Sequence, residues 1–183
     1  RRDGALLHAG GQLRPGDYAL PGDVSSQYIS GLLMALPRLA GESTLTVTGG
    51  LESAGYIAMT EDALRLSGIR LKKDARKYTV PGGQTAQLPA QCRVEGDWSN
   101  AAFLLALGEG VTVTGLRPDS LQGDRVCRDM LHRLERPGAV LDISACPDLG
   151  PVLFAAAARS CGGVFTGTHR LRIKESDRIA AMA

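Results

Sequence analysis

The sequence has 183 residues, of which 44% are hydrophobic and 22% charged, and its basic residues outnumber its acidic ones by two. This length and hydrophobic content allow a sizeable core in one large domain or two small ones. The charge is balanced, there is no basic block and only 4% of the residues are aromatic, which argues against a surface that binds nucleic acid or membranes. The apolar runs are shorter than the roughly 20 residues of a membrane span. We therefore expect neither nucleic acid nor a membrane as a partner.

Start and stop signals divide the first half of the chain into helices and strands. Residues 22–26 read Gly-Asp-Val-Ser-Ser and open an apolar helix that runs through Leu36. A β-branched strand follows, and Ser53 is placed to cap a second helix that ends at Gly68. Three short strands fill the remaining stretches. The predicted strand ranges, with the β-branched strand first, are 46–49, 69–72, 77–80 and 91–95.

The order of these elements recurs in the second half. Residues 96–100 read Gly-Asp-Trp-Ser-Asn and open a helix through Leu107, which repeats the start at 22–26. A third copy begins at Pro147 and Asp148. The elements predicted after residue 107 are a strand at 112–115, a helix at 124–135, a strand at 139–143, a helix at 149–160 and a strand at 164–167. The repeated unit is β-α-β-α-β-β, used about twice and begun a third time.

Recurrence at this scale predicts stacked modules. We expect an α/β protein with mixed sheets, built from repeated βαβαββ units in two lobes. The chain is expected to cross between the lobes near Glu95 and Gly96, where one unit closes and the next opens. Residues 1–95 would then form part of an N-terminal lobe, and residues 96–183 part of a C-terminal lobe.

The two ends lack the usual signals. Arg1 is not an initiator Met, no signal-peptide pattern follows it, and the helix predicted near Ala183 has no Gly, Asn or Pro to end it. We expect the sequence to be a central piece of a longer protein.

The cysteines argue against a metal site and against a disulfide framework. None of the four belongs to a Cys-x-x-Cys pair or has a histidine at zinc spacing; they are Cys92, Cys127, Cys146 and Cys161. A reducing cytoplasm therefore fits this sequence, and we expect no metal.

If the modules are equivalent, their helix starts converge on one cleft, and the polar residues there are candidate site residues. These candidates are Ser25, Ser26, Gln27, Ser53, Tyr56, Asp148, Lys174, Glu175 and Arg178. Most have a structural alternative: Ser25 and Ser53 can be plain N-caps, Asp148 a cap or first-turn acid, and Tyr56 a core residue. Only one cap is needed before an apolar helix, so the residues after Ser25 favour binding.

The segment 171–178 reads Leu-Arg-Ile-Lys-Glu-Ser-Asp-Arg. We expect a strand to end near Ile173 and a helix to start around Glu175. Lys174 and Arg178 would then lie beside the positive end of that helix, which is unfavourable unless an anion joins them. The charge pattern alone leaves two interpretations open, a phosphate or carboxylate site and a solvated turn with a Glu175–Arg178 pair.

Five short motifs follow one another along the chain: 25–30 with 32–35, Tyr56 with Thr60, 122–124, 147–149 and 172–178. In sequence and order they closely resemble the family of 5-enolpyruvylshikimate-3-phosphate (EPSP) synthases, the 3-phosphoshikimate 1-carboxyvinyltransferases. The resemblance covers essentially all 183 residues, but only the middle of a family member.

This resemblance implies a cytoplasmic enzyme of the shikimate pathway, monomeric in its full length, with two lobes of three βαβαββ copies each that close on substrate. The implied reaction moves the enolpyruvyl group of phosphoenolpyruvate onto the 5-hydroxyl of shikimate 3-phosphate through a tetrahedral intermediate, and releases phosphate. These two small molecules are the implied partners. No metal or organic cofactor is implied.

The resemblance also assigns roles to the residues of the first repeat. By motif match, Ser25 and Ser26 hold the shikimate phosphate with help from Ser53. Gln27 reaches both substrates, and Tyr56 borders the site. Hydroxyls and helix N–H groups are chemically suited to a phosphate.

The later motifs would supply the chemistry. The resemblance implies that Asp148 takes or orients the proton of the 5-hydroxyl and that Lys174 binds the same substrate. It implies that Glu175 exchanges a proton with the methylene carbon, and that Arg178 clamps phosphoenolpyruvate with its forked guanidinium.

The chain departs from the family pattern in several places. Ala54 and Gly55 stand where many members have Lys and Pro, which weakens the assignment of Ser53. Arg170 stands where some members have a substrate-binding Asn, and we assign it no role. The family's N-terminal Lys and Ser motif, its phosphoenolpyruvate-binding Arg and its late His-Arg and Lys motifs have no counterpart in the 183 residues. We therefore expect the chain alone to be inactive.

Two alternatives remain. One is a relative of the enzyme that transfers enolpyruvyl to UDP-N-acetylglucosamine, although that enzyme has a reactive Cys loop and lacks the motif at 174–178. The other is a non-catalytic half that binds a phosphorylated ligand.

Overall fold

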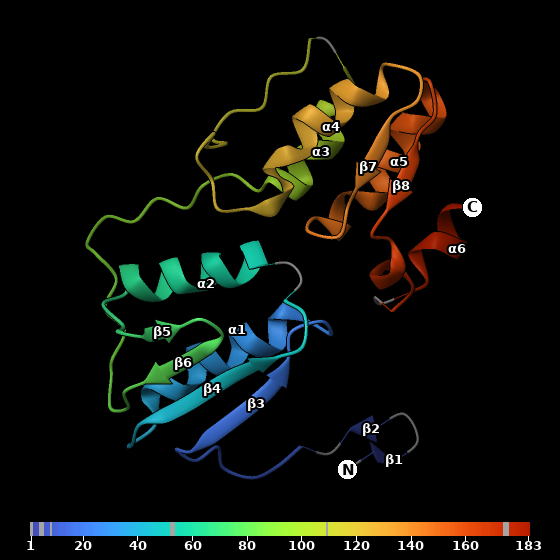
Figure 1. Ribbon diagram of the computed structural model, residues 1–183. Helices are drawn as coiled ribbons and strands as arrows, with labels where there is room; N and C mark the ends of the chain where they lie inside the picture. The colour runs from blue at the N-terminus through green and yellow to red at the C-terminus, as the bar shows by residue number, and fades with distance from the viewer. Residues whose placement is uncertain (1, 4–5, 8, 52–53, 109, 174–175) are drawn as a thin grey trace.

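The computed structural model describes residues 2–3, 6–7, 9–51, 54–108, 110–173 and 176–183. Its elements form two groups, each around its own hydrophobic core (Figure 1). The first core takes its buried side chains from residues 29–80, and the second from residues 98–171. The lobe boundary at Glu95 and Gly96 stays a prediction, and it falls between these two sets.

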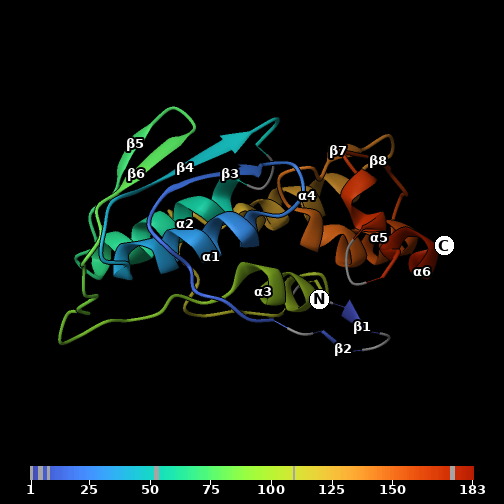
Figure 2. The ribbon, with the colours of Figure 1, turned by 90° about the horizontal axis from the view of Figure 1, so that it is seen from below.

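The first group contains one complete repeat unit. Its elements are β3 (Asp17–Pro21), α1 (Ser26–Ala35), a 3₁₀ turn (Leu36–Arg38), β4 (Ser43–Thr48), α2 (Ala54–Leu66), β5 (Lys72–Asp74) and β6 (Lys77–Val80). The sheet order is β3-β4-β6-β5, with β3 and β4 parallel and the other pairs antiparallel. Both helices pack on the same face of this mixed sheet (Figure 2). The predicted β-α-β-α-β-β order is confirmed here.

Period-2 burial explains how β4 and its helices form the first core. Leu45 and Val47 of β4 point inward and alternate with half-buried threonines. Ile29 and Leu33 lie one turn apart on α1, so they cover the same stripe of that helix and meet the sheet. This packing fixes the N-terminal end of α1 relative to α2.

The second group is mainly helical. Its elements are α3 (Trp98–Leu105), a 3₁₀ turn (Gly123–Val126), α4 (Cys127–Leu134), β7 (Val140–Asp142), a 3₁₀ turn (Pro147–Leu149), α5 (Gly150–Arg159), β8 (Val164–Thr166), a 3₁₀ turn (His169–Arg172) and α6 (Arg178–Met182). Strands β7 and β8 pair in parallel. A short hairpin, β1 (Arg2–Asp3) with β2 (Leu6–Leu7), lies apart from both groups (Figure 1).

Three of the predicted strands need correction. The ranges 91–95 and 112–115 form no strand, because neither finds a pairing strand within the described residues, and an unpaired strand leaves its backbone groups unsatisfied. The strand predicted at 69–72 starts later, as β5. Ile69 instead closes α2, since its N–H donates to Leu64 O (2.9 Å) while Gly68 adopts a positive φ of 75°.

The prediction for the charged segment near the C-terminus is wrong in two respects. The residues before Ile173 form a 3₁₀ turn rather than a strand. Helix α6 begins at Arg178 rather than near Glu175, because Asp177 is its N-cap and accepts from the N–H groups of Ile179 and Ala180, at 3.1 Å each. The helix expected at 124–135 likewise begins as a 3₁₀ turn before α4.

Across the described ranges, no helix combines the length and apolarity that a membrane span requires. The longest helix of the described ranges, α2, has 13 residues.

Candidate active site between the two cores

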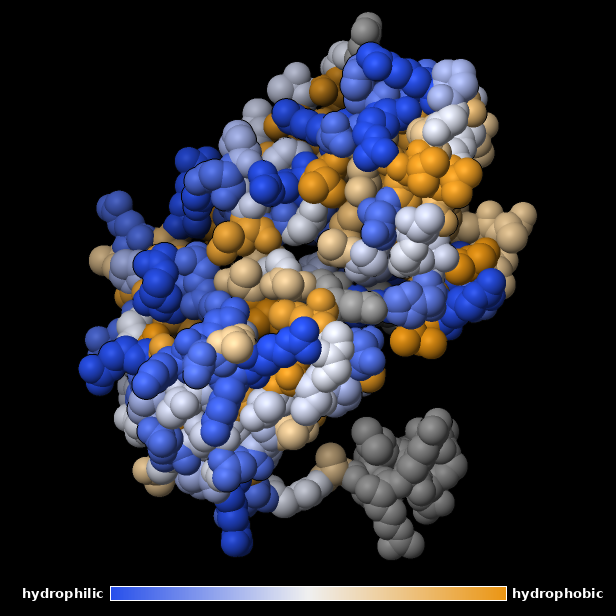
Figure 3. All heavy atoms as spheres, in the orientation of Figure 1, coloured by the Kyte–Doolittle hydropathy of each residue, from blue (hydrophilic) through white to orange (hydrophobic). Residues whose placement is uncertain are grey.

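A cavity of about 550 Å³ lies where the N-terminal end of α1, one face of α2 and the second group meet. Five predicted site residues line it together: Ser25, Ser26, Gln27, Tyr56 and Asp148. In Figure 3, hydrophilic side chains dominate the outer rim of the visible face, while hydrophobic ones gather between the two groups and on the flank of the second. The convergence expected from the repeat therefore brings together residues from both halves of the chain.

The N-terminal end of α1 is open toward the cavity. Ser25 is its N-cap in an extended conformation, and its Oγ accepts from the N–H of Gln27 at 3.2 Å. Ser26 is buried in the first turn and is not needed as a cap. The first turn contains no acidic residue, so none of its own side chains neutralises the positive helix end. This combination suits a phosphate or carboxylate ligand.

Two hydroxyls of the cavity wall, those of Ser30 and Thr60, link α1 to α2. Thr60 Oγ1 donates to the carbonyl of Tyr56 at 3.1 Å. Ser30 Oγ lies 2.7 Å from Thr60 Oγ1, and because Thr60 has already used its proton, Ser30 is the donor. Both residues line the cavity. Sequence reasoning gave neither a role, although their polar side chains on facing helical stripes were a visible signal.

Tyr56 reaches from α2 into the second group. Its Oη lies 2.9 Å from Asp124 Oδ2 and 3.0 Å from Asp148 Oδ2. Burial, followed by the negative charges of Asp124 and Asp148, raises the pKa of the Tyr56 phenol well above its usual range. Tyr56 is therefore a neutral hydroxyl that links the two cores, not an isolated core residue.

Asp148 is held from two sides. It lies in the 3₁₀ turn before α5, and its Oδ1 accepts from Arg178 Nη1 at 2.8 Å while its Oδ2 faces Tyr56. Both members of the ion pair are partly exposed, with 24% and 30% of their side chains accessible. Arg178 is the first residue of α6, so Asp148 supplies the anion that offsets a cation at a positive helix end.

Three predicted site residues lie outside the described residues, namely Ser53, Lys174 and Glu175. The solvated Glu175–Arg178 pair is untested for the same reason, although Arg178 itself contacts Asp148. Conversely, Arg170 is 4% exposed and lines the cavity, a position that the sequence did not reveal.

The sequence did not predict that Asp124 belongs to the site. It is 2% exposed and lies behind Tyr56, where Ser99 Oγ also donates to its Oδ2. Burial is the main cause that raises the pKa of Asp124, and the charges of Asp148 and Asp97 add to it. The Gln-Gly-Asp motif at 122–124 marked this segment without assigning it a function.

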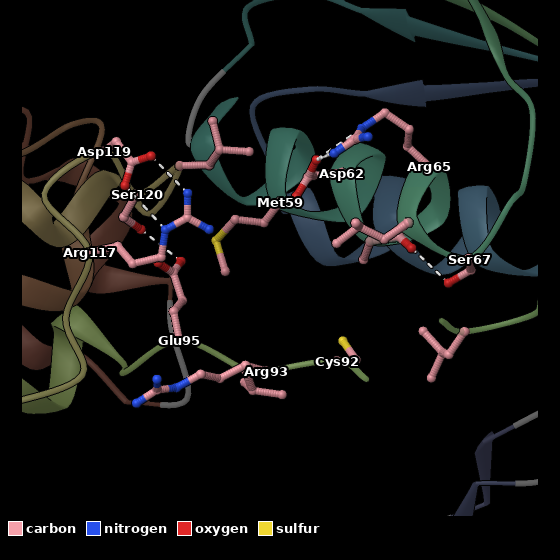
Figure 4. A pocket seen from close by; sticks show the side chains of 15 residues that line it. Met59, Asp62, Arg65, Ser67, Cys92, Arg93, Glu95, Arg117, Asp119 and Ser120 are labelled. Atoms are coloured by element: carbon pink, nitrogen blue, oxygen red, sulfur yellow. Dashed lines mark hydrogen bonds and ion pairs between the residues drawn. The ribbon is translucent and has the colours of Figure 1, made fainter. Parts of the chain in front are cut away.

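A second cavity, of about 530 Å³, lies beside α2 and shares Met59 and Ala63 with the first. Figure 4 shows Arg117 among Asp119, Ser120 and Glu95. Its guanidinium contacts Asp119 at 2.8 and 3.1 Å and lies 4.0 Å from Glu95 Oε2. This cation is already neutralised by protein carboxylates, so the site with the open helix end is the stronger candidate for an anionic ligand.

Among the described residues, no group of three or more His, Cys, Asp or Glu is arranged to hold a metal ion. The four cysteines are free thiols, with Cys127 and Cys146 buried. The residues that line the first cavity can bind an anion at α1, exchange a proton at Asp148 and stabilise negative charge through Arg170.

Comparison with known proteins gives one consistent result. The family described as "EPSP synthase (3-phosphoshikimate 1-carboxyvinyltransferase)" matches residues 6–140. A 3-phosphoshikimate 1-carboxyvinyltransferase of Clostridium kluyveri is 43% identical over 96% of this chain and 46% of its own length, and one of Clostridium acetobutylicum is 41% identical over 97% and 46%. The chain thus spans about half the length of the curated relatives it matches.

Solved structures agree. An EPSP synthase from Acinetobacter baumannii superposes with a TM-score of 0.69 at 27% identity, over 93% of this chain and 44% of that one. A second structure from the same organism gives a TM-score of 0.66 at 25% identity. The mixed α/β fold and its repeated unit are therefore those of this structural class.

Proposed function

The chain belongs to the EPSP synthase family, and we propose that the complete protein transfers the enolpyruvyl group of phosphoenolpyruvate to the 5-hydroxyl of shikimate 3-phosphate. The observation that carries this proposal is the cavity that joins the open N-terminal end of α1 to Asp148 and Tyr56. It offers an anion site and a proton acceptor from different halves of the chain within one space.

The shikimate phosphate is assigned to the start of α1. Ser26 Oγ and the free N–H groups of the first turn bind it, while Ser25 caps the helix and Gln27 reaches toward both substrates. Ser53 is included on the family motif alone. A dianionic phosphate at this end also replaces the acidic residue that the first turn lacks.

Asp148 is assigned to the acceptor hydroxyl. In the addition step, the 5-hydroxyl oxygen bonds to C2 of phosphoenolpyruvate, its proton passes to Asp148, and the methylene carbon gains a proton from Glu175. In the elimination step, the C2–O bond to phosphate breaks, the leaving phosphate takes up the proton that Asp148 had accepted, and the methyl carbon returns a proton to Glu175. General acid and base groups of this kind typically contribute about 10² to 10⁴ in rate.

Lys174 and Arg178 are assigned to the substrates. Arg178 uses one N–H for Asp148, and a guanidinium has five, so it can hold phosphoenolpyruvate at the same time. Lys174 is placed beside the acceptor substrate by motif match. We further propose a monomeric protein in the cytoplasm that needs no cofactor.

The test is phosphate release by the complete protein with phosphoenolpyruvate and shikimate 3-phosphate. Turnover with these two substrates is expected, and no turnover when UDP-N-acetylglucosamine replaces shikimate 3-phosphate. The reverse preference would favour the UDP-N-acetylglucosamine relative, and binding without turnover would favour the non-catalytic alternative.

The 183-residue chain alone is expected to match the enzyme-free control in the same assay. The family's other substrate-binding motifs have no counterpart in it, and residues that act as one site lose far more than the sum of their parts. Turnover by the chain alone would contradict the proposed sharing of the site.

A further inference from the structure

The phenol of Tyr56 faces two carboxylates but has only one proton. Its Oη is within hydrogen-bond distance of Asp124 Oδ2 at 2.9 Å and of Asp148 Oδ2 at 3.0 Å. A phenol donates once and accepts through its oxygen. If both carboxylates were ionised, one of the two contacts would set a carboxylate oxygen against the phenol lone pairs.

Counting protons shows what the arrangement needs. Three contacts join four groups: Ser99 with Asp124, Asp124 with Tyr56, and Tyr56 with Asp148. Ser99 and Tyr56 supply one proton each, which leaves one contact without a proton. One carboxyl group must therefore carry the third.

The surroundings place that proton on Asp124. Asp148 is 30% exposed and paired with Arg178, and both features stabilise its ionised form. Asp124 is 2% exposed, and its Oδ1 has no hydrogen-bond partner within the described part of the chain. Burying an ionised carboxylate without a cation is costly, whereas the neutral acid avoids that cost.

The hydrogen bonds from Ser99 and Tyr56 lower the pKa of Asp124, but burial outweighs them, and the charged groups nearby do not offset a negative charge. Asp97, from the start of α3, and Asp148 are acidic and raise its pKa further. Burial raises the pKa of the neighbouring thiols as well, to about 11 for Cys127 and about 12 for Cys146, so both stay neutral.

The two arginines near Asp124 along the chain are engaged elsewhere. Arg125 donates to the carbonyl of Pro118 at 3.2 Å, and Arg128 lies 5.4 Å from the centre of the Trp98 ring. Among the described residues, neither guanidinium forms an ion pair or a hydrogen bond with Asp124.

We propose that Asp124 is protonated at neutral pH and is a positioning residue, which donates to Tyr56 so that the single phenol proton points to Asp148. The chain of donors runs Asp124, Tyr56, Asp148, and it ends on the carboxylate that lines the cavity. This chain of donors keeps Asp148 ionised and oriented as the proton acceptor, and that consequence for catalysis rests on the proposed function. The protonation state itself does not depend on the substrates.

The direct test is carbon NMR of the complete protein with ¹³C-labelled aspartate carboxyl groups. The resonances of Asp124 and Asp148 are assigned by their loss in Asp124→Asn and Asp148→Asn. At neutral pH, Asp124 should show the shift of a protonated acid and Asp148 that of a carboxylate. Asp119→Asn is the control, because Asp119 is an exposed carboxylate paired with Arg117. It should remove only its own resonance and leave those of Asp124 and Asp148 in place. An ionised Asp124, or a proton on Asp148, would overturn the proposal whatever the substrates are.

Kinetics test the positioning role. An Asn at 124 is neutral and can donate to Tyr56 through its Nδ2, as a protonated acid does, whereas Ala cannot. We expect Asp124→Asn to keep at least about tenfold more kcat than Asp124→Ala, with similar KM values for the two variants. Equal losses in both variants would mean that the ionised form is required. Thermal melts identify any variant that is unfolded. If the Ala variant is unfolded, the kcat of Asp124→Asn is compared with that of the wild type, and a large loss in the folded Asn variant would contradict the proposal.

A double variant tests whether Asp124 acts through Tyr56. Once Tyr56→Phe has removed the phenol, Asp124→Ala should cost nothing further in kcat, because coupled residues are not additive. Additive losses would show that Asp124 acts by another route. Tyr78→Phe is the matched control, since Tyr78 is buried and also donates to a carboxylate, that of Glu61, away from the cavity.

Discussion

Some polar side chains at the helix starts are N-caps, and others are not needed as caps. Ser25 caps α1, Asp97 caps α3 and Asp177 caps α6, each by accepting from a backbone N–H two residues ahead. The sequence indicated the Ser25 cap because such caps are local, whereas the Asp177 cap was missed when the last helix was expected to start around Glu175. It also marks Ser26 as surplus. The structure gives that residue a buried place in the cavity wall.

Replacing Ser26 with Ala tests the surplus hydroxyl. In the complete enzyme, Ser26→Ala is expected to raise KM for shikimate 3-phosphate by about tenfold with kcat nearly kept, because a hydrogen bond to a charged group is worth about 1.5–3 kcal/mol and is present before and during reaction. Steady-state kinetics with varied shikimate 3-phosphate measures it. Ser67→Ala, which loses a hydroxyl bonded to the carbonyl of Ala63, should leave KM unchanged. A fall in kcat alone would remove Ser26 from substrate binding.

The thiols should differ sharply in reactivity. Burial raises the pKa of Cys146 to about 12 and that of Cys127 to about 11, so almost no thiolate is present at about pH 8, while Cys92 and Cys161 are exposed. Cys161→Ser should remove one fast-reacting group in a titration with a chromogenic disulfide. Cys127→Ser should remove one that reacts only after unfolding. Loss of a fast group in Cys127→Ser would contradict the buried position.

At the scale of elements, the sequence predicted what is local and failed where pairing decides. Helices α1, α2, α3 and α5 were expected from caps and apolar periodicity. The strand expected at 112–115 has β-branched character and the one at 91–95 has a single valine, but a strand needs a neighbour, and that information is not local. Strand β5 starts at Lys72 and not at Ile69, because the N–H of Ile69 donates to Leu64 O and closes α2 after Gly68. A period-2 pattern had assigned Ile69 to the strand.

Two helical glycines give a matched test of packing between elements. Gly31 of α1 has open space where a Cβ would lie, so Gly31→Ala should raise the free energy of unfolding by about 0.5–1 kcal/mol through helix propensity. Gly55 of α2 would place a Cβ 3.1 Å from Gly123 N and from Leu121 O, which are backbone atoms of the other group. Gly55→Ala should lose that gain or become destabilising.

Urea unfolding of both glycine variants provides the measurement. The absence of a side chain at Gly55 lets α2 approach the segment that holds Asp124. An equal gain in both variants would show that α2 has room to move away from that segment.

At the scale of the whole molecule, the candidate site exists only where the two cores meet. The repeat predicted that helix starts converge, and Ser25, Ser26, Tyr56 and Asp148 do lie around one cavity. The role of Asp124 could not be predicted, because its partners are 25 and 68 residues away and its burial depends on how the cores pack. The sequence therefore indicated the rim of the site but not the buried acid behind it.

The predicted crossing at Glu95 and Gly96 is held by one buried amide. Gln122 is 7% exposed; its Oε1 accepts from Trp98 N at 2.8 Å, and its Nε2 donates to Glu95 Oε1 and to Gly96 O, at 2.9 Å each. Ser120 supports Glu95 with a further bond of 2.8 Å. This cluster ties the start of α3 to the segment that leaves the first group.

Gln122→Leu should therefore destabilise the protein by about 2–4 kcal/mol, because it leaves buried donors and acceptors unpaired at about 1–3 kcal/mol each. Gln84→Leu is the matched control. Gln84 also makes three hydrogen bonds, to Arg70 N, Arg70 O and Pro81 O, but near the surface, where water can replace them, so its loss should stay near about 1 kcal/mol. Urea unfolding monitored by the fluorescence of Trp98, the single tryptophan of the chain, compares the two variants. Equal losses would mean that water reaches Gln122 and that the crossing is not a buried joint.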